Sequence, residues 1–243
     1  MSEPEVRNTS AGPVELPIRY DDASALFLFG TTTAEVAEEL LDGTGLAPVS
    51  LPGGRPLWGI GCYNYRRTSI GPYNEVGVAL LARREGGRGL TVPASYVVDL
   101  PVTTEIACAG GRDIYGFPKF VTDIDANLSG RHCEVTVRDP EGATIMRLEW
   151  TRRIAVPAPA FDLRTWSRLD GELLRTPVEM WGKFHAGLPL GLKLEVGDSD
   201  HGMARRLRRL TAHNTSLVLI HGPQVRMLLH GGEPATHASA NAA

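Results

Sequence analysis

Short runs of β-branched, aromatic and apolar residues, each bounded by Gly or Pro, dominate the middle of this sequence. Three of them cover residues 57–64, 76–83 and 91–100. Runs of this length and composition are typical of β-strands. The second and third are separated by the Gly-rich segment 85–89, which is typical of a hairpin connection. The pattern predicts a sheet in which neighbouring strands are mainly antiparallel.

The clearest hairpin pairs residues 132–138 with 143–152 across Asp139-Pro-Glu-Gly. Asp at the first turn position, Pro at the second and Gly at the fourth are the residues that a type I turn prefers. A second hairpin is expected from residues 216–221 and 224–230, near the end of the chain. The alternation within the first hairpin predicts a buried face that includes Val135, Val137, Ile145, Leu148 and Trp150.

Helices are predicted at fewer places. Residues 24–29 form an apolar run typical of a buried strand, and Thr32 followed by Glu35 is a capping-box pattern that starts a helix through Leu41. Residues 164–175 also fit a helix. Residues 203–210 fit either a helical face or a strand.

These elements predict an α+β protein that is predominantly antiparallel β, with a closed, barrel-like sheet and a few flanking helices. A chain of 243 residues can bury one full core. We expect a flexible N-terminal arm over residues 1–16, a single domain over 17–232 and a disordered tail over 233–243.

Composition excludes several classes of function. The net charge of −3 gives no reason to expect nucleic acid as a partner, and the basic run 205–209 lacks the interleaved aromatics of an RNA site. No apolar run is long enough to cross a membrane, and no signal-peptide pattern is present. Three widely spaced cysteines fit a reducing cytoplasm. The histidines show no metal-ligand spacing, so we expect neither a metal nor a cofactor.

Lysine usage points to a reactive group. The chain contains 22 arginines but only three lysines, and Lys119 lies between Pro118 and Phe120. Arginine stays protonated in proteins, whereas a lysine removed from water can become a neutral amine that attacks carbonyl groups. An ordinary lysine has a pKa of about 10.4, so a nucleophilic lysine needs apolar surroundings or a neighbouring cation.

The segment Arg112-Asp-Ile-Tyr-Gly-Phe-Pro-Lys119 resembles the Schiff-base lysine segment of the acetoacetate decarboxylase family. The segment 71–77, which contains Glu75, resembles that family's glutamate turn, and the separation of 44 residues from Glu75 to Lys119 is similar too. The resemblance runs from about residue 24 to about residue 232. It implies a barrel-like fold, a homo-oligomer, Lys119 as the amine nucleophile and Glu75 as the proton-transfer group. We also expect supporting or substrate-contacting roles for Arg112, Tyr115, Phe117, Phe120 and Tyr73.

Three features depart from the family's decarboxylases. Phe120 stands where they carry a second lysine, residues 22–25 lack their carboxylate-binding arginine, and residues 59–61 lack their second acidic residue. Arg19 is close enough in sequence to replace the arginine. We therefore expect little acetone production from acetoacetate.

The resulting hypothesis is an enzyme of specialised metabolism that acts on a ketone or β-keto substrate through an imine on Lys119, by aldol, dehydration or decarboxylation chemistry. An alternative is a non-covalent cyclase that encloses a polyketide-like intermediate, and a third is a small-molecule binding protein. Purely structural roles also stay open. Glu75 could pair with Arg66 or Arg67, and Arg112 with Asp113 or Glu105.

Overall fold

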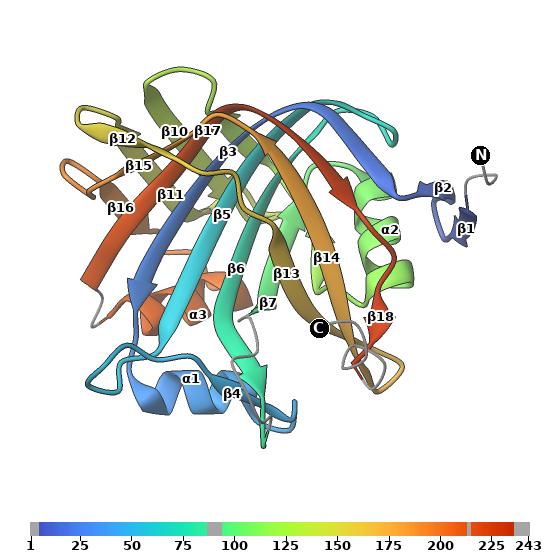
Figure 1. Cartoon of the computed structure of the whole chain (residues 1–243), viewed down its shortest axis with the longest axis horizontal. Helices are drawn as coiled ribbons and strands as arrows, with labels where there is room; N and C mark the ends of the chain where they lie inside the picture. The colour runs from blue at the N-terminus through green and yellow to red at the C-terminus, as the bar shows by residue number, and fades with distance from the viewer. Residues whose placement is uncertain (1–4, 87–93, 213–214, 236–243) are drawn as a thin grey trace.

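Seven strands of the computed structural model close into a barrel, whose order around the ring is β17-β3-β5-β6-β7-β13-β14 and back to β17 (Figure 1). The structure describes residues 5–86, 94–212 and 215–235. Every neighbouring pair in the ring is antiparallel except β7 and β13, which run parallel. The prediction of a mainly antiparallel closed sheet is confirmed. The barrel strands are β3 (Ile18–Thr31), β5 (Leu57–Thr68), β6 (Tyr73–Arg84), β7 (Ala94–Val102), β13 (Leu163–Leu169), β14 (Glu172–Gly182) and β17 (Thr215–Leu229).

Shorter strands extend this sheet at its edges. They are β4 (Leu46–Pro48), β8 (Lys119–Val121), β12 (Ala155–Ala158), β15 (Phe184–Gly187) and β18 (Glu233–Pro234). A separate four-stranded sheet lies against the outside of the barrel. Its strands, in spatial order, are β16 (Lys193–Val196), β11 (Thr144–Thr151), β10 (His132–Arg138) and β9 (Ile124–Asn127).

Three helices flank the sheets: α1 (Ala34–Leu41), α2 (Glu105–Tyr115) and α3 (Gly202–Thr211). Thr33, rather than Thr32, caps α1, because its side chain accepts a hydrogen bond from the Val36 N–H. Residues 203–210, which fitted helix or strand, form most of α3. Its buried face contains Met203, Leu207 and Leu210, as a period of 3.6 residues requires.

Two hydrophobic cores lie on opposite faces of the barrel wall. One fills the space between the wall and the four-stranded sheet, and it includes the residues predicted to be buried in the β10–β11 hairpin. The other fills the barrel interior and continues to α2. Strand alternation divides β5 between them, since Cys62 faces the outer core whereas Tyr63 and Tyr65 face the interior.

Two predictions of local structure are wrong. Residues 164–175 form the β13–β14 hairpin rather than a helix, because Asp170-Gly171, with φ of 50° and 84°, makes the tight turn that joins two strands. Residues 216–221 and 224–229 belong to one long strand, β17, rather than to the two arms of a hairpin. Its register shifts between Gly222 and Val225, so that Pro223 lies in a bulge where its missing N–H costs no ladder hydrogen bond.

The chain ends also differ from the expected arm and tail. Residues 5–16 form the hairpin of β1 (Glu5–Thr9) and β2 (Gly12–Leu16), in which Val14 and Leu16 are buried. Apolar residues in alternation give this segment something to bury, which a flexible arm lacks. Residues 233–235 continue the sheet as β18 and a buried Ala235. Residues 236–243 of the expected tail lie outside the described residues, as do 87–89 of the expected 85–89 connection.

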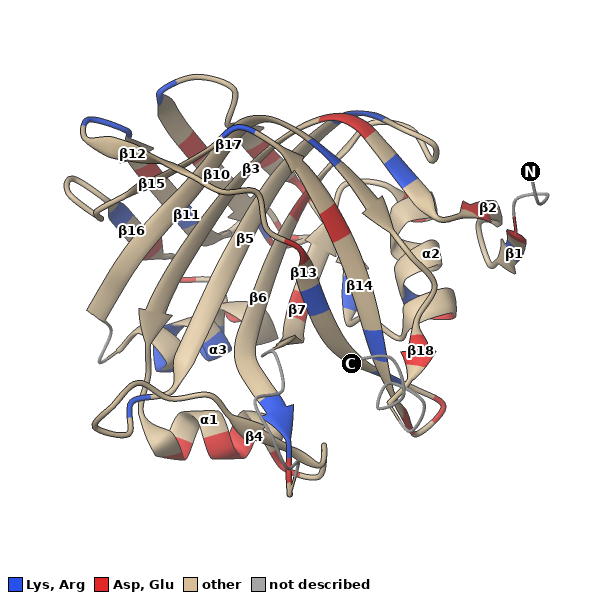
Figure 2. Cartoon of the chain, in the orientation of Figure 1, with Lys and Arg blue, Asp and Glu red and all other residues tan. Residues whose placement is uncertain are grey.

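The basic run 205–209 ties α3 to the rest of the protein. Arg206 hydrogen-bonds the buried carboxylate of Asp99, at 2.8 Å between Nε and Oδ2. Arg209 pairs with Glu39 of α1, and Figure 2 shows the blue and red residues of these two helices. Arg208 donates to the carbonyl oxygens of Gly197 and Ser199. Arg205 donates to the Asp200 carbonyl oxygen, so all four arginines in this run have structural partners.

Candidate active site

Lys119 reaches the barrel interior from a turn that only particular residues allow. Helix α2 ends at Gly116, whose φ of 64° is left-handed and whose Cβ, if present, would lie 2.1 Å from the Arg168 carbonyl oxygen. A side chain is therefore excluded there. The Phe117 N–H donates to the Gly111 carbonyl, and Lys119 then pairs with Leu100 in the parallel contact of β8 with β7. The turn sets Lys119 at the interior edge of β7.

Glu75 meets this lysine from the opposite direction. It lies on the interior face of β6, and its Oε2 is 2.6 Å from Lys119 Nζ. The side chains of Lys119 and Glu75 are only 5% and 9% exposed. Arg66 and Arg67 instead pair with Asp22 and Asp21 on the surface. The ion-pair partner of Glu75 is therefore Lys119 and not Arg66 or Arg67.

Four tyrosines surround the ion pair. The Tyr65 hydroxyl donates to Glu75 Oε1 at 3.2 Å, which leaves Oε2 facing Lys119. The hydroxyls of Tyr20 and Tyr73 are 3.0 Å apart, and Lys119 Nζ is 5.8 Å from the centre of the Tyr73 ring. Burial, and then the charge of Glu75, raise the pKa of Tyr20 and Tyr65 well above the ordinary value. These phenols therefore stay neutral near pH 7. The fourth, Tyr63, stacks on Tyr65.

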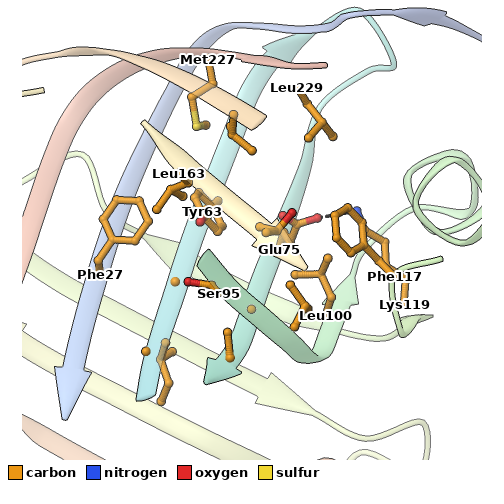
Figure 3. A pocket seen from close by; sticks show the side chains of 18 of the residues that line it. Phe27, Tyr63, Glu75, Ser95, Leu100, Phe117, Lys119, Leu163, Met227 and Leu229 are labelled. Atoms are coloured by element: carbon orange, nitrogen blue, oxygen red, sulfur yellow. Dashed lines mark hydrogen bonds and ion pairs between the residues drawn. The ribbon is translucent and has the colours of Figure 1, made fainter. Parts of the chain in front are cut away.

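A cavity of about 110 Å³ lies beside the ion pair, inside the barrel. Figure 3 shows Lys119 and Phe117 together at one side of it, Glu75 next to them and Phe27 at the opposite side. Apolar side chains from most barrel strands form the walls. Among the lining residues, all within the described chain, Lys119 is the only lysine or arginine and Glu75 the only carboxylate. The walls include Phe27, Phe29, Val97, Leu100, Leu163, Val178, Met227 and Leu229.

The predicted supporting residues divide into three groups. Phe117 lines the cavity, and the Tyr73 ring contacts the lysine. Tyr115 stacks behind Phe117, with ring centres 5.4 Å apart, and does not line the cavity. Phe120 and Arg112 lie elsewhere: Phe120 packs into the outer core against His201, because successive strand residues face opposite sides, and Arg112 is exposed on α2.

Arg19 does not replace the missing carboxylate-binding arginine. Its side chain is half exposed and pairs with Glu15, outside the barrel. Cys108, which could have lined the cavity, is a buried thiol of α2 outside the lining, and burial raises its pKa. The other two cysteines are also free and buried.

Sequence reasoning missed Tyr20, Tyr63 and Tyr65. The alternation Tyr63-Asn-Tyr65 in a predicted strand was a usable signal, since residues two apart share one face of a sheet. It did not tell which face. Among the described residues, no three His, Cys, Asp or Glu side chains gather as metal ligands, and no helix is long and apolar enough to cross a membrane.

Residues 4–170 match the model of the acetoacetate decarboxylase (ADC) family, which is more than half of the chain. The chain belongs to this family. No curated protein matches this family member closely enough to count as a relative. The matched range contains both Glu75 and Lys119.

Solved structures agree with this assignment. This chain has a TM-score of 0.72 with the acetoacetate decarboxylase of Legionella pneumophila. The identity is 15%, and the match covers 97% of this chain and 92% of that one. It has a TM-score of 0.66 with the enduracididine biosynthesis enzyme MppR complexed with pyruvate, at 12% identity over 96% and 98%. An ADC-like enzyme from Sphingomonas wittichii RW1 has a TM-score of 0.64, at 14% identity over 91% and 93%. At these low identities, the TM-scores establish a shared fold and nothing more.

Proposed function

We propose that this protein is an enzyme that forms an imine between Lys119 and a ketone or β-keto substrate, with Glu75 as the proton-transfer group. The observation that carries the proposal is the 2.6 Å contact between Lys119 Nζ and Glu75 Oε2 in an apolar cavity. Elsewhere on a protein, a lysine paired with a carboxylate is a surface feature exposed to water. Here the pair is buried and borders space that a small molecule could fill.

The contact supplies a route to the neutral amine that attack requires. Moving one proton from Nζ to Oε2 converts ammonium and carboxylate into amine and carboxylic acid, with no change in total charge. Burial favours that neutral pair over two separated charges. The amine then attacks the carbonyl carbon, while Glu75 gives its proton to the carbonyl oxygen and takes one from the attacking nitrogen, which produces a carbinolamine and leaves Glu75 protonated.

Glu75 can serve each later step. As the acid, it donates its proton to the carbinolamine hydroxyl, which leaves as water and produces the iminium ion. As the resulting carboxylate, it accepts a proton from the carbon next to the iminium, whose C–H bonding electrons move to form the enamine. The hydrogen bond from Tyr65 holds the carboxyl group in place during both transfers. Aldol addition and dehydration proceed from this enamine, whereas retro-aldol cleavage starts from the iminium ion and produces the enamine.

Two of the similar structures support a carbonyl substrate and a role in specialised metabolism. MppR is an enduracididine biosynthesis enzyme, and it has been captured with pyruvate and with the condensation product of pyruvate and imidazole 4-carboxaldehyde. Ready decarboxylation of acetoacetate is not expected. No arginine lines the cavity among the described residues, and Phe120 replaces the second lysine without facing the interior.

Borohydride reduction tests the proposal directly. The protein is incubated with acetone, acetylacetone or pyruvate, reduced, and examined by intact mass and peptide mapping. The expected result is one adduct on Lys119, absent from Lys119→Arg. Mapping is simple because the other lysines, Lys183 and Lys193, are exposed and serve as internal controls for non-specific reaction. Adducts on all three lysines alike, or none with any probe, would contradict the proposal and favour a non-covalent cyclase or a binding protein.

A further inference from the structure

The interior face of strands β5 and β6 changes character abruptly next to Glu75. Its first two cross-strand pairs are bulky: Tyr65 opposite Tyr73, and Tyr63 opposite Glu75. The next two pairs consist of the smallest residues, Gly61 opposite Gly77 and Gly59 opposite Ala79, and all four line the cavity. The low floor formed by these four residues, here called the glycine floor, therefore begins directly beside the proton-transfer group.

Neighbouring side chains keep this floor low. A Cβ on Gly61 would lie 2.8 Å from the Tyr63 hydroxyl, and one on Gly77 would lie 3.0 Å from Leu100 Cδ1. Both distances are too short for normal contact, so larger residues would displace the cavity walls. The side chains that flank the floor on the neighbouring strands are apolar, and they include Phe27 and Phe29 of β3 and Val97 of β7. The space above the floor thus suits a hydrocarbon substituent rather than a polar one.

Charge balance gives a second, independent constraint. Once an iminium forms on Lys119, its positive charge is matched by the Glu75 carboxylate 2.6 Å from the same nitrogen. A substrate carboxylate would add a second buried anion, whereas the cavity lining contains no further lysine or arginine among the described residues. An unpaired buried charge is strongly unfavourable, and the neutral tyrosines are not cations. An uncharged substrate leaves the site balanced.

From these two observations we infer that the substrate is an uncharged ketone whose apolar substituent lies over the glycine floor, with its carbonyl carbon at Lys119. This inference rests on the proposed imine chemistry and adds the class of substrate to it. The carbonyl end meets the two charged residues. The opposite end contacts only apolar side chains and the floor, apart from the hydroxyls of Ser95, Thr165 and Tyr63.

A matched pair of ketones separates the apolar class from the anionic class. Levulinate and 5-methyl-2-hexanone both place a methyl ketone two methylenes from a branched end group, which is a carboxylate in the first and an isopropyl group in the second. Borohydride trapping on Lys119 is measured with each, and with acetone as a probe that carries no long substituent. We expect the apolar ketone to be trapped at least 10-fold faster than levulinate, at equal concentration and pH.

Ala79→Leu tests where the substituent lies. The added isobutyl group fills the floor, so the ratio of the trapping rate of 5-methyl-2-hexanone to that of acetone should fall at least 10-fold relative to wild type. The acetone result also shows that the variant is folded and that its lysine is reactive. If Ala79→Leu proves insoluble, Ala79→Val supplies a smaller obstruction at the same position.

The outcomes test the substrate class and the imine chemistry separately. Equal trapping of levulinate and 5-methyl-2-hexanone overturns the inferred substrate class and leaves the imine proposal standing. An unchanged ratio of the two trapping rates in Ala79→Leu overturns the placement over the floor. Failure of every probe, acetone included, overturns the imine chemistry and this inference with it.

Discussion

The backbone of Gly111 lies directly against the side chain of Lys119. A Cβ at Gly111 would be only 2.3 Å from Lys119 Cδ and 2.4 Å from Cε. The hydrocarbon stem of the lysine therefore crosses helix α2 at Gly111, where no side chain intervenes. A residue that touches neither substrate nor Glu75 thus determines where the amine lies.

Gly111→Ala should lower the reactivity of Lys119 without unfolding the protein. Alanine favours a helix over glycine by about 1 kcal/mol, but its methyl group must displace Lys119. We expect trapping on Lys119 to fall at least 10-fold, while thermal unfolding shows the variant still folded. Gly110→Ala is the matched control, because its methyl group would lie 3.7 Å from Val14, an ordinary contact. Equal trapping rates in the two variants would show that the lysine stem does not depend on Gly111.

Glu75→Gln should slow turnover while leaving the amine in place. General acid–base catalysis contributes typically 10²- to 10⁴-fold, so we expect a fall of that size in the rate of α-proton exchange. Exchange is measured by NMR with acetone in deuterated water. The Gln amide can still accept the hydrogen bond from Tyr65, which preserves the packing. An exchange rate within threefold of wild type would assign proton transfer to another group.

Tyr65→Phe removes the hydrogen bond that fixes Glu75 Oε1 and leaves the ring in place. A hydrogen bond to a charged group contributes about 1.5–3 kcal/mol, so the carboxylate becomes free to turn and exchange should slow about 10-fold or more. Tyr63→Phe is the control, since Tyr63 lines the same cavity but does not bond Glu75. A larger loss in Tyr63→Phe would point to direct contact between that hydroxyl and substrate.

Stability should decline as the pH falls below about 6.5, partly through His221. Burial lowers the pKa of this fully buried imidazole, which lies beside Cys133 and bonds the Leu128 carbonyl. Because the unfolded chain then binds the proton first, this contribution is complete above the ordinary pKa of about 6.5 and is lost toward the lower folded value.

One such group gives a slope of at most about 1.4 kcal/mol per pH unit. Urea unfolding between pH 5.5 and 7.5 measures that slope, and His221→Gln should flatten it. A slope of the same steepness in the variant would assign the effect to other groups.

The sequence predicted the barrel and the pairing of Lys119 with Glu75 from two different kinds of signal. Strand-like runs with Gly and Pro boundaries are local features, and they marked β5, β6, β10 and β11 correctly. The lysine–glutamate pair came from two motifs 44 residues apart. Neither signal depends on how distant strands pair.

The failures depended on such pairing. Asp170-Gly171 connects two strands because β13 pairs with β7 and β14 pairs with β17. No local sequence pattern encodes these pairings. Phe120 follows Lys119 in the sequence, yet it faces the outer core because β8 adopts strand alternation. The floor became visible only when register placed Gly61 opposite Gly77.

At the parallel contact between β7 and β13, residues from the first two thirds of the chain meet residues from the last third in the cavity wall. Lys119, Glu75 and the glycine floor all precede β13 in the sequence, inside the range matched by the family model. Val178, Met227 and Leu229, which form part of the opposite wall, lie beyond that range. Part of the cavity wall therefore lies outside the stretch that holds Lys119, Glu75 and the floor. Substitutions at Val178, Met227 or Leu229 can change the shape of the cavity without changing Lys119 or Glu75.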